Sequence, residues 1–198
     1  MGKTQIFNEY KKLFLEKNQV LNLISKNDEK YLEEKHIKDS LSIKLFFDKY
    51  NFSGKTLLDI GTGGGFPALP IAIEYPNFEV TGIDSTAKKI RAISDIAENL
   101  NLKNFKTICD RVENIKDKKF DLITSRAVAK LDLIVQYALP LLQTNGYLVV
   151  YKSKTAQEEI TQAEKTLKKH KAKVIDVIEY KLPLEEIYER NLVIIKHV

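Results

Sequence analysis

A glycine-rich segment between an apolar run and a proline constrains the fold of this chain most strongly. Residues 56–66 read Thr-Leu-Leu-Asp-Ile-Gly-Thr-Gly-Gly-Gly-Phe, and Pro67 follows. The apolar start is typical of a buried parallel strand. Glycine adopts backbone conformations that other residues resist, and proline suits the first turn of a helix because it has no N–H to leave unpaired. A strand, a glycine loop and a helix in this order predict a ligand site at the carboxyl end of an α/β sheet.

The residues around the loop indicate which nucleoside cofactor binds. Gly61 and Gly63 match the dinucleotide fingerprint G-x-G-x-x-G/A, but its third small position is Phe66. A bulky ring there argues against a pyrophosphate, and Asp59 before the loop suits a cationic ligand. S-adenosylmethionine, which carries a sulfonium and no phosphate, agrees with both observations. Asp84 ends the next strand-like run and is placed to accept hydrogen bonds from both ribose hydroxyls, which favours a cofactor site over a plain tight turn.

Length and cysteine content limit the class of protein. The chain has 198 residues, which suits one domain with an extension. Cys109 is the only cysteine, so no internal disulfide can form and a reducing cytoplasm is the expected location; at the end of an apolar strand we expect it in the core. The three histidines (36, 170 and 197) lack metal-ligand spacing, so no metal is expected. No apolar run reaches membrane-spanning length, so no membrane partner is expected.

The charge balance is moderately basic. The 32 basic and 27 acidic side chains give a net charge of +5, which is compatible with a nucleic-acid partner without requiring one. The densest cluster consists of the lysines at positions 165, 168, 169, 171 and 173. A solvated helix face is the favoured interpretation of this cluster over a phosphate contact.

The chain divides into a helical start and an alternating remainder. Apolar stripes predict helices within residues 1–50, with N-cap chemistry at Asn27-Asp28-Glu29 for the second helix. From residue 51 onward we expect a single α/β domain. Its strands are expected at 56–60, 78–83, 105–109, 120–124, 146–151, 173–180 and 191–197, and its helices at 67–74, 86–100, 132–141 and 155–170.

This alternation predicts a parallel sheet covered on both faces. The last two strands have no full helix between them, so they are expected to pair antiparallel at one edge. Seven strands with such a closing pair are the architecture of class I S-adenosylmethionine-dependent methyltransferases. The expected fold is therefore α/β and Rossmann-like, with a seven-stranded, mostly parallel sheet and an N-terminal helical extension.

Six segments, in order, resemble the bacterial small-subunit rRNA guanine-N7 methyltransferase family, also called glucose-inhibited division protein B. They are Asn22-Leu23, His36-Ile-Lys-Asp-Ser-Leu41, Leu58-Asp-Ile-Gly-Thr-Gly-Gly-Gly-Phe-Pro67, Ile83-Asp-Ser-Thr-Ala-Lys-Lys89, Arg111-Val-Glu113, and Ser125-Arg-Ala127 after Phe120-Asp121. They span residues 22–127, over half of the chain. Departures from the family pattern are Ile24 for threonine, Ala68 for glycine, Ser153 for the glycine after Lys152, and the absence of tryptophan.

The resemblance implies a reaction and its partners. It implies methyl transfer from S-adenosylmethionine to the N7 of a guanine in the 530 loop of 16S rRNA, by a monomer that acts on 16S rRNA or the small ribosomal subunit. Carried over residue by residue, the cofactor contacts of the family fall on Gly61, Phe66, Val112, Glu113 and Arg126. Val112 and Glu113 follow the third strand, where the adenine ring is expected.

Four polar residues are candidates for roles on the substrate side. Arg126 and His36 are the candidate catalytic residues, and Arg126 and Lys152 are candidate contacts of the rRNA phosphates. A structural ion pair is the equal alternative for Arg126. His36 and Asp39 lie one turn apart on a predicted helix and can share a face that closes the pocket or meets RNA. For Asp39 a hydrogen bond from this helix to the sheet domain is the favoured alternative.

The absence of a catalytic dyad in the sequence agrees with N7 chemistry. Ser125-Arg126-Ala127-Val128 does not match the Asn/Asp-Pro-Pro-aromatic motif of adenine amino methyltransferases, and Cys109 lies away from the expected centre. Guanine N7 has a lone pair and no proton to remove, so positioning alone can supply much of the rate enhancement. The alternatives are a methyltransferase of another substrate, a non-catalytic ribosome- or RNA-binding module, and, least favoured because of Phe66, a nicotinamide oxidoreductase.

Overall fold

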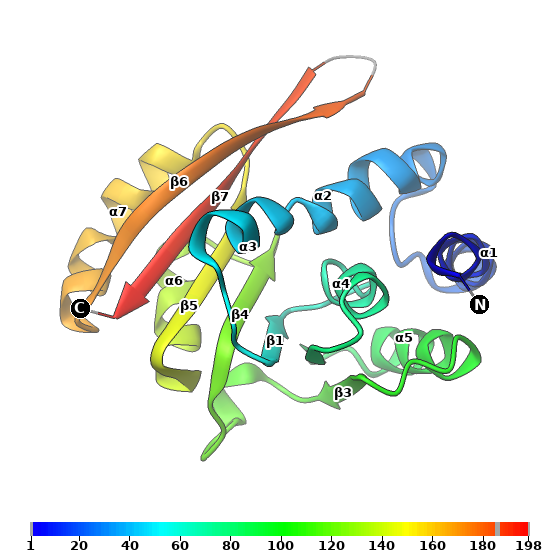
Figure 1. The fold of residues 1–198 in the computed structure, drawn as a ribbon, viewed down its shortest axis with the longest axis horizontal. Coiled ribbons are helices and arrows are strands. Elements are labelled where there is room, and N and C mark those ends of the chain that lie inside the picture. The colour runs from blue at the N-terminus through cyan, green and yellow to red at the C-terminus, as the bar shows by residue number, and fades with distance from the viewer. Residues whose placement is uncertain (1, 185–186, 198) are drawn as a thin grey trace.

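The centre of the molecule is a seven-stranded sheet with strand order β3-β2-β1-β4-β5-β7-β6 (Figure 1). The computed structural model describes residues 2–184 and 187–197. The strands are β1 (Thr56–Ile60), β2 (Glu79–Asp84), β3 (Phe105–Cys109), β4 (Phe120–Arg126), β5 (Leu142–Lys152), β6 (Ala172–Pro183) and β7 (Ile187–His197). Strands β1 to β5 run parallel, whereas β7 is antiparallel to both β5 and β6. The parallel sheet and the antiparallel closing pair expected from the sequence are both confirmed.

The sheet is buried on both faces because successive strand residues enter two different cores. Leu57 and Val149 belong to one core and Leu58 and Val150 to the other, and all four are at most 1% exposed. Full burial of one such side chain stabilises the fold by about 1.5–3 kcal/mol. The first core is covered by α4 (Ala68–Glu74) and α5 (Ala87–Asn99), and the second by α6 (Leu131–Ala138) and α7 (Ala156–Lys169). Short 3-10 turns, η3 (Val112–Asn114) and η4 (Leu139–Leu141), follow β3 and α6.

The N-terminal region is helical, as expected, and packs on the first of these cores. Its elements are α1 (Lys3–Leu21), the 3-10 helix η1 (Lys26–Tyr31), the π-helix η2 (Leu32–Lys38), α2 (Asp39–Leu41) and α3 (Lys44–Tyr50). Tyr10 and Phe14 of α1 are fully buried, and the Phe14 ring centroid lies 5.1 Å from that of Phe66 in the glycine loop. This region therefore lies over the loop and shares its core, and the division of the chain at residue 50 stays a prediction.

Two local expectations were wrong. The N-cap of η1 is Ser25 rather than the Asn27–Glu29 segment, because the Ser25 hydroxyl accepts a hydrogen bond from the Asp28 N–H (3.2 Å). Cys109 is exposed rather than in the core. It is the last residue of β3, and β3 is an edge strand, so the thiol has neighbours on fewer sides than a residue of a central strand.

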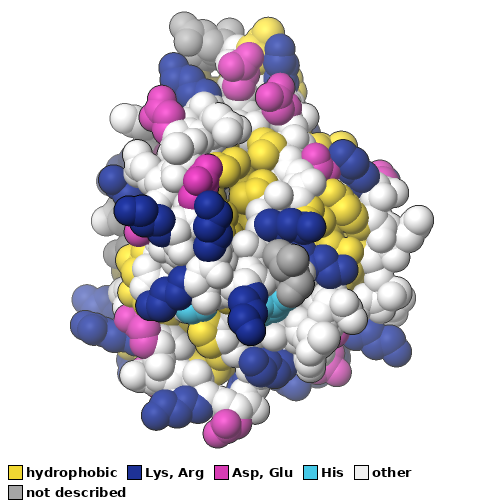
Figure 2. All heavy atoms as spheres, turned by 90° about the vertical axis from the view of Figure 1, so that its left-hand side faces the viewer, with side chains coloured by type: hydrophobic (Ala, Val, Ile, Leu, Met, Phe, Trp, Pro, Cys, Tyr) yellow, Lys and Arg dark blue, Asp and Glu magenta, His cyan; other side chains and the backbone are white. Residues whose placement is uncertain are grey.

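The surface carries its positive charge mainly as dispersed side chains. The face on which α7 lies displays many Lys and Arg side chains with acidic ones among them (Figure 2). The lysines at positions 165, 168, 169, 171 and 173 are all exposed. In the described part of the chain, no helix combines the length and apolar character needed to cross a bilayer. Within residues 2–184 and 187–197, no group of His, Cys, Asp and Glu side chains is arranged to hold a metal ion.

Candidate active site

The glycine loop connects β1 to α4 at the carboxyl edge of the parallel strands. Gly61, Gly63 and Gly65 have φ angles of +67°, +54° and +89°, in the region that side chains other than glycine rarely adopt. A Cβ atom on Gly61 would lie 2.3 Å from Cγ2 of Val128. The Gly63 N–H donates a hydrogen bond to Oδ2 of Asp84 (3.0 Å), so the loop is tied to the end of β2.

Two adjoining cavities open at this loop. The larger measures about 470 Å³ and reaches from Asp84 to the N-terminal helices and to β7. The smaller measures about 350 Å³ and extends toward η3. Gly61, Asp84 and Val128 line both cavities, so these residues mark the seam between them.

Most of the predicted cofactor residues lie around these two cavities. Gly63, Phe66 and Arg126 line the larger cavity, and Val112 and Glu113 line the smaller one. With the two residues at the seam, Gly61 and Asp84, the structure brings together seven of the eight positions. The roles of these seven residues in binding the cofactor stay predictions.

The eighth position, Asp59, lies elsewhere. Its carboxyl group is fully buried and lines neither cavity, so it does not face a cationic ligand directly. The hydroxyl of Thr124 donates to its Oδ1 (2.9 Å), while Oδ2 is buried and has no partner at hydrogen-bond geometry among the described residues. Burial raises the pKa of Asp59 to about 7, although the side chains of Thr62 and Thr124 and then the charge of Arg126 oppose the shift. The reason is strand geometry, since Asp59 points to the same helix-covered face as Leu57.

Arg126 lies in a buried cluster of charges. Its guanidinium donates from Nη1 to Oδ2 of Asp39 (3.0 Å) and lies 5.0 Å from the centroid of the Phe66 ring. Asp39, on α2, also accepts hydrogen bonds from Nε and Nη2 of Arg190 (3.2 and 3.3 Å) and from the Tyr180 hydroxyl (2.5 Å). The side chains of Asp39, Arg126 and Arg190 are only 3%, 11% and 11% exposed. The structural ion pair considered for Arg126 is therefore present, and it lies at the cavity wall.

His36 contacts the same cluster as a neutral ring. Nη2 of Arg126 donates to its Nδ1 (3.1 Å), which places the proton of the neutral ring on Nε2. Burial, and then the positive charge of Arg126, lower the pKa of His36 to about 4. Nε2 is buried, and within residues 2–184 and 187–197 it has no hydrogen-bond partner. His36 and Asp39 thus share a face on the larger cavity, as their spacing predicted.

Lys152 is engaged inside the protein. Its ammonium contacts Oε2 of Glu159 (2.6 Å) and donates to the Ala129 carbonyl (2.8 Å), and the residue is 9% exposed. A contact with an rRNA phosphate would require the ammonium to leave Glu159. That contact stays a prediction.

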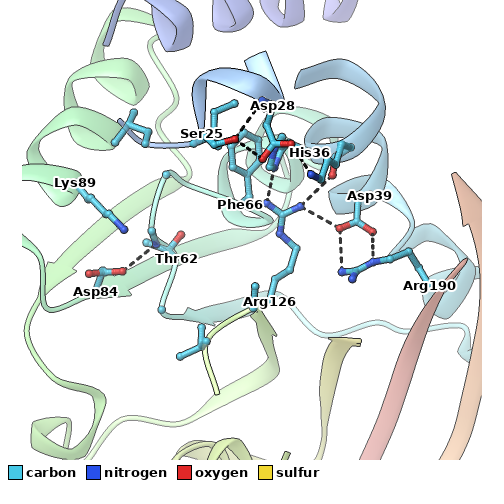
Figure 3. Close-up of a pocket in the computed structure, with 18 of the residues that line it drawn as sticks. Ser25, Asp28, His36, Asp39, Thr62, Phe66, Asp84, Lys89, Arg126 and Arg190 are labelled. Atoms are coloured by element: carbon cyan, nitrogen blue, oxygen red, sulfur yellow. Dashed lines mark hydrogen bonds and ion pairs between the residues drawn. The ribbon is translucent and has the colours of Figure 1, made fainter. Parts of the chain in front are cut away.

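The structure adds residues to the site that the sequence did not single out for it. Asp28 and Lys35 of the N-terminal region, Lys89 of α5, and Tyr188 and Arg190 of β7 all line the larger cavity (Figure 3). Asp28 had a sequence signal only as a helix-capping residue. Arg190 had none, because the pairing of β7 with β5 and β6 is what brings it to the cavity.

Comparison with known proteins identifies the family of this chain. Residues 3–193 match the family described as GidB, rRNA small subunit methyltransferase G. The chain belongs to this family. The Ribosomal RNA small subunit methyltransferases G of Listeria monocytogenes and Bacillus licheniformis are each 36% identical to it, over 96% of this chain and 80% of theirs. A crystal structure of an S-adenosylmethionine-dependent methyltransferase from Clostridium acetobutylicum has the same fold, with a TM-score of 0.66, 14% identity, and coverage of 86% of this chain and 95% of that one.

Membership in the methyltransferase G family confirms the resemblance, the fold class and an enzyme that transfers methyl groups with S-adenosylmethionine as its cofactor. The geometry at the seam fits this cofactor. Asp84 accepts one hydrogen bond on each oxygen, from the N–H groups of Gly63 and Thr86, and so keeps lone pairs for ribose hydroxyls. Because Asp84 already uses the Gly63 N–H and brings a negative charge to the loop, a diphosphate would be disfavoured there.

Proposed function

We propose that this methyltransferase G family member transfers a methyl group to the N7 of a guanine in the 530 loop of 16S rRNA. The family acts on small-subunit rRNA. What we propose beyond this is the base and the atom that are methylated. The observation that best supports methylation at N7 is how Arg126 and His36, which line the larger cavity, are paired. Arg126 is paired with Asp39, and His36 is a neutral ring whose acceptor nitrogen already receives a hydrogen bond. Guanine N7 has a lone pair and no proton, so its methylation requires no general base.

The residues of the chain position the reactants. When bound, S-adenosylmethionine supplies a methyl group whose bond to sulfur breaks as the bond to N7 forms, with the electron pair remaining on sulfur. Asp84 is placed to hold the ribose, while Val112 and Glu113 line the cavity proposed for adenine. The absence of a side chain on Gly61 makes room for Val128, whose Cγ2 would lie 2.3 Å from a Cβ atom at that position. Positioning of this kind lowers barriers by up to about 7–11 kcal/mol in well-oriented systems.

The charge at the cavity wall bears on the role of Arg126. The guanine ring becomes positive as the methyl group arrives, so an unpaired cation beside it would raise the barrier. Asp39 is shared by Arg126 and Arg190, so this group of three side chains carries one net positive charge at the cavity wall. Arg126 is therefore better suited to orienting the cofactor or substrate than to electrostatic catalysis.

Labelled S-adenosylmethionine tests the proposal. The protein is incubated with the label and with small-subunit RNA that lacks its native methylation, and the RNA is digested to nucleosides. We expect 7-methylguanosine, mapped to the 530 loop. Label in another nucleoside or in an RNase-resistant acceptor would assign a different substrate. Calorimetry that detects RNA binding but no binding of S-adenosylmethionine would indicate a non-catalytic RNA-binding module.

We further infer that the enzyme works as a monomer in the cytoplasm. The N-terminal helices, the glycine loop, β4 and β7 of the same chain together line the larger cavity, which supports a site that is complete in one protomer. A substrate that is bacterial ribosomal RNA supports a cytoplasmic location. The exposed, unpaired thiol of Cys109 is in keeping with the reducing conditions there.

A further inference from the structure

The larger cavity has a second polar end, formed by the N-terminal region. Ser25, Asp28 and Lys35 line it. Figure 3 places Ser25 and Asp28 above Phe66 and apart from Asp84 and Lys89. The seam at Asp84 is the cofactor side, because it adjoins the smaller cavity. The rest of the cavity remains for the acceptor base, and it includes the end around Asp28 and the wall formed by Arg126 and Arg190.

Asp28 is an ionised and accessible carboxylate. The Ser25 hydroxyl donates to its Oδ2 (2.8 Å), and the Lys35 ammonium contacts its Oδ1. Burial alone would raise the pKa of Asp28, but hydrogen bonds from Lys35 and Ser25 outweigh it and hold that pKa below its usual value. The side chain is 23% exposed. A carboxylate has about four lone-pair positions, so Asp28 can accept two further hydrogen bonds.

Among the described residues, the other two carboxylates that line this cavity face other partners. Asp39 is 3% exposed and receives hydrogen bonds from two arginines and Tyr180. Asp84 binds the glycine loop and lies at the seam. Among the described residues that line the larger cavity, Asp28 is thus the carboxylate with acceptor capacity toward a base.

The chemistry of guanine matches this placement. Its N1–H and 2-amino donors lie on the six-membered ring, across the base from N7. A base that turns N7 toward the cofactor seam presents these two donors to the far end of the cavity. Adenine offers an acceptor at N1 and no 2-amino group, so a carboxylate there would repel it.

We propose that Asp28 accepts hydrogen bonds from the N1–H and the 2-amino group of the target guanine and thereby makes the site specific for guanine. The proposal rests on the proposed function, since it assumes an acceptor base in the larger cavity. Positive charge that develops on the ring makes N1–H a stronger donor, so the contact with Asp28 strengthens in the transition state. Recognition of an unstacked base through this edge is the usual mode for enzymes that modify single bases.

Inosine in place of the target guanosine tests the contact directly. Inosine keeps N7, O6 and N1–H but lacks the 2-amino group. With wild-type protein we expect kcat/KM to be lower for the inosine RNA by roughly 10- to 100-fold, the value of one hydrogen bond to a charged partner. Equal rates on the two RNAs would overturn the proposal.

Substitution of Asp28 tests its part in that preference. In Asp28→Ala we expect kcat/KM for guanosine RNA to fall and the guanosine-to-inosine ratio to approach one, while affinity for S-adenosylmethionine stays unchanged. Asp28→Asn retains the volume and is expected to give an intermediate ratio. Asp95→Ala serves as the matched control, because Asp95 forms an ion pair with Lys17 (2.6 Å) and lies outside both cavities.

The outcomes separate this proposal from the one on which it rests. Absence of 7-methylguanosine with wild-type protein and guanosine RNA would refute the proposed function. Methylation by the wild type with an unchanged ratio in both Asp28 variants would refute the role of Asp28 alone. A loss of S-adenosylmethionine affinity with the ratio preserved would instead assign Asp28 to the ammonium group of the cofactor, which also overturns the proposal.

Discussion

Gly61 is the residue at which the two halves of the site meet. Its φ of +67° is accessible to glycine at little cost, whereas for other residues the left-handed region costs about 1–2 kcal/mol. A Cβ atom here, 2.3 Å from Cγ2 of Val128, would be far closer than carbon atoms approach one another. A methyl group there would also project into the seam between the cavities.

We therefore expect Gly61→Ala to weaken S-adenosylmethionine binding by at least about tenfold, from strain and displacement of Val128. Isothermal titration calorimetry measures the effect. Gly2→Ala makes the same chemical change where, chain neighbours aside, no atom of the described residues lies within 4 Å of the added Cβ, and its affinity should equal that of the wild type. Equal affinities for Gly61→Ala and Gly2→Ala would show that the seam does not bind the cofactor.

At the scale of elements, Asp39 joins segments that lie far apart in the sequence. It is the first residue of α2 and binds Arg126 of β4, Tyr180 of β6 and Arg190 of β7. One carboxylate therefore fastens the N-terminal region to the middle and to the closing pair of the sheet. Removal of one partner from a buried ionic cluster leaves uncompensated charge in a poorly solvated place.

Asp39→Ala is thus expected to lower the free energy of unfolding by about 3–5 kcal/mol. Urea denaturation followed by circular dichroism measures this. Asp48→Ala is the comparison, since Asp48 pairs with Lys44 at an exposed position and should lose less than about 1 kcal/mol. Similar losses in the two variants would mean that the cluster around Asp39 contributes no more than a surface ion pair.

At the scale of the whole molecule, two buried groups give stability opposite dependences on pH. The unfolded chain releases the Asp59 proton near the ordinary pKa of 3.8, whereas the folded protein keeps it until about 7. Between these values the folded state binds more protons, so the contribution of Asp59 to stability falls as pH rises. His36 has an ordinary pKa of 6.5 and a folded pKa of about 4, so its contribution rises with pH over that window.

Asp59→Asn isolates the first effect, because His36 is present in both proteins. The stability of the wild type relative to the variant should fall between pH 4 and pH 7, by an amount on the order of 4 kcal/mol. Urea unfolding at several pH values gives this difference. Asp48→Asn makes the same chemical change at an exposed position and serves as the control. A difference between wild type and Asp59→Asn that does not change with pH would contradict the raised pKa.

The sequence predicted what depends on local pattern. Apolar runs and glycine indicated the strands, the loop and the neighbourhood of Gly61 and Asp84. The residues that reached the site through long-range pairing, Asp28 and Arg190, had no local signal for that role. Asp59 was placed wrongly because its charge suggested a ligand contact, whereas the twofold periodicity of a strand puts it on the covered face. The prediction that Cys109 is buried was wrong because a local sequence pattern does not distinguish an edge strand from a central one.

The position of β7 between β5 and β6 has a consequence for biosynthesis. A nascent chain that has not yet reached residue 187 lacks the strand that joins these two, and it also lacks Arg190. Until the ribosome has made and released this segment, β5 keeps an unpaired edge, and Asp39 has one arginine instead of two. Assembly of a competent site therefore has to wait for β7, and premature termination before residue 187 should leave an inactive, aggregation-prone product.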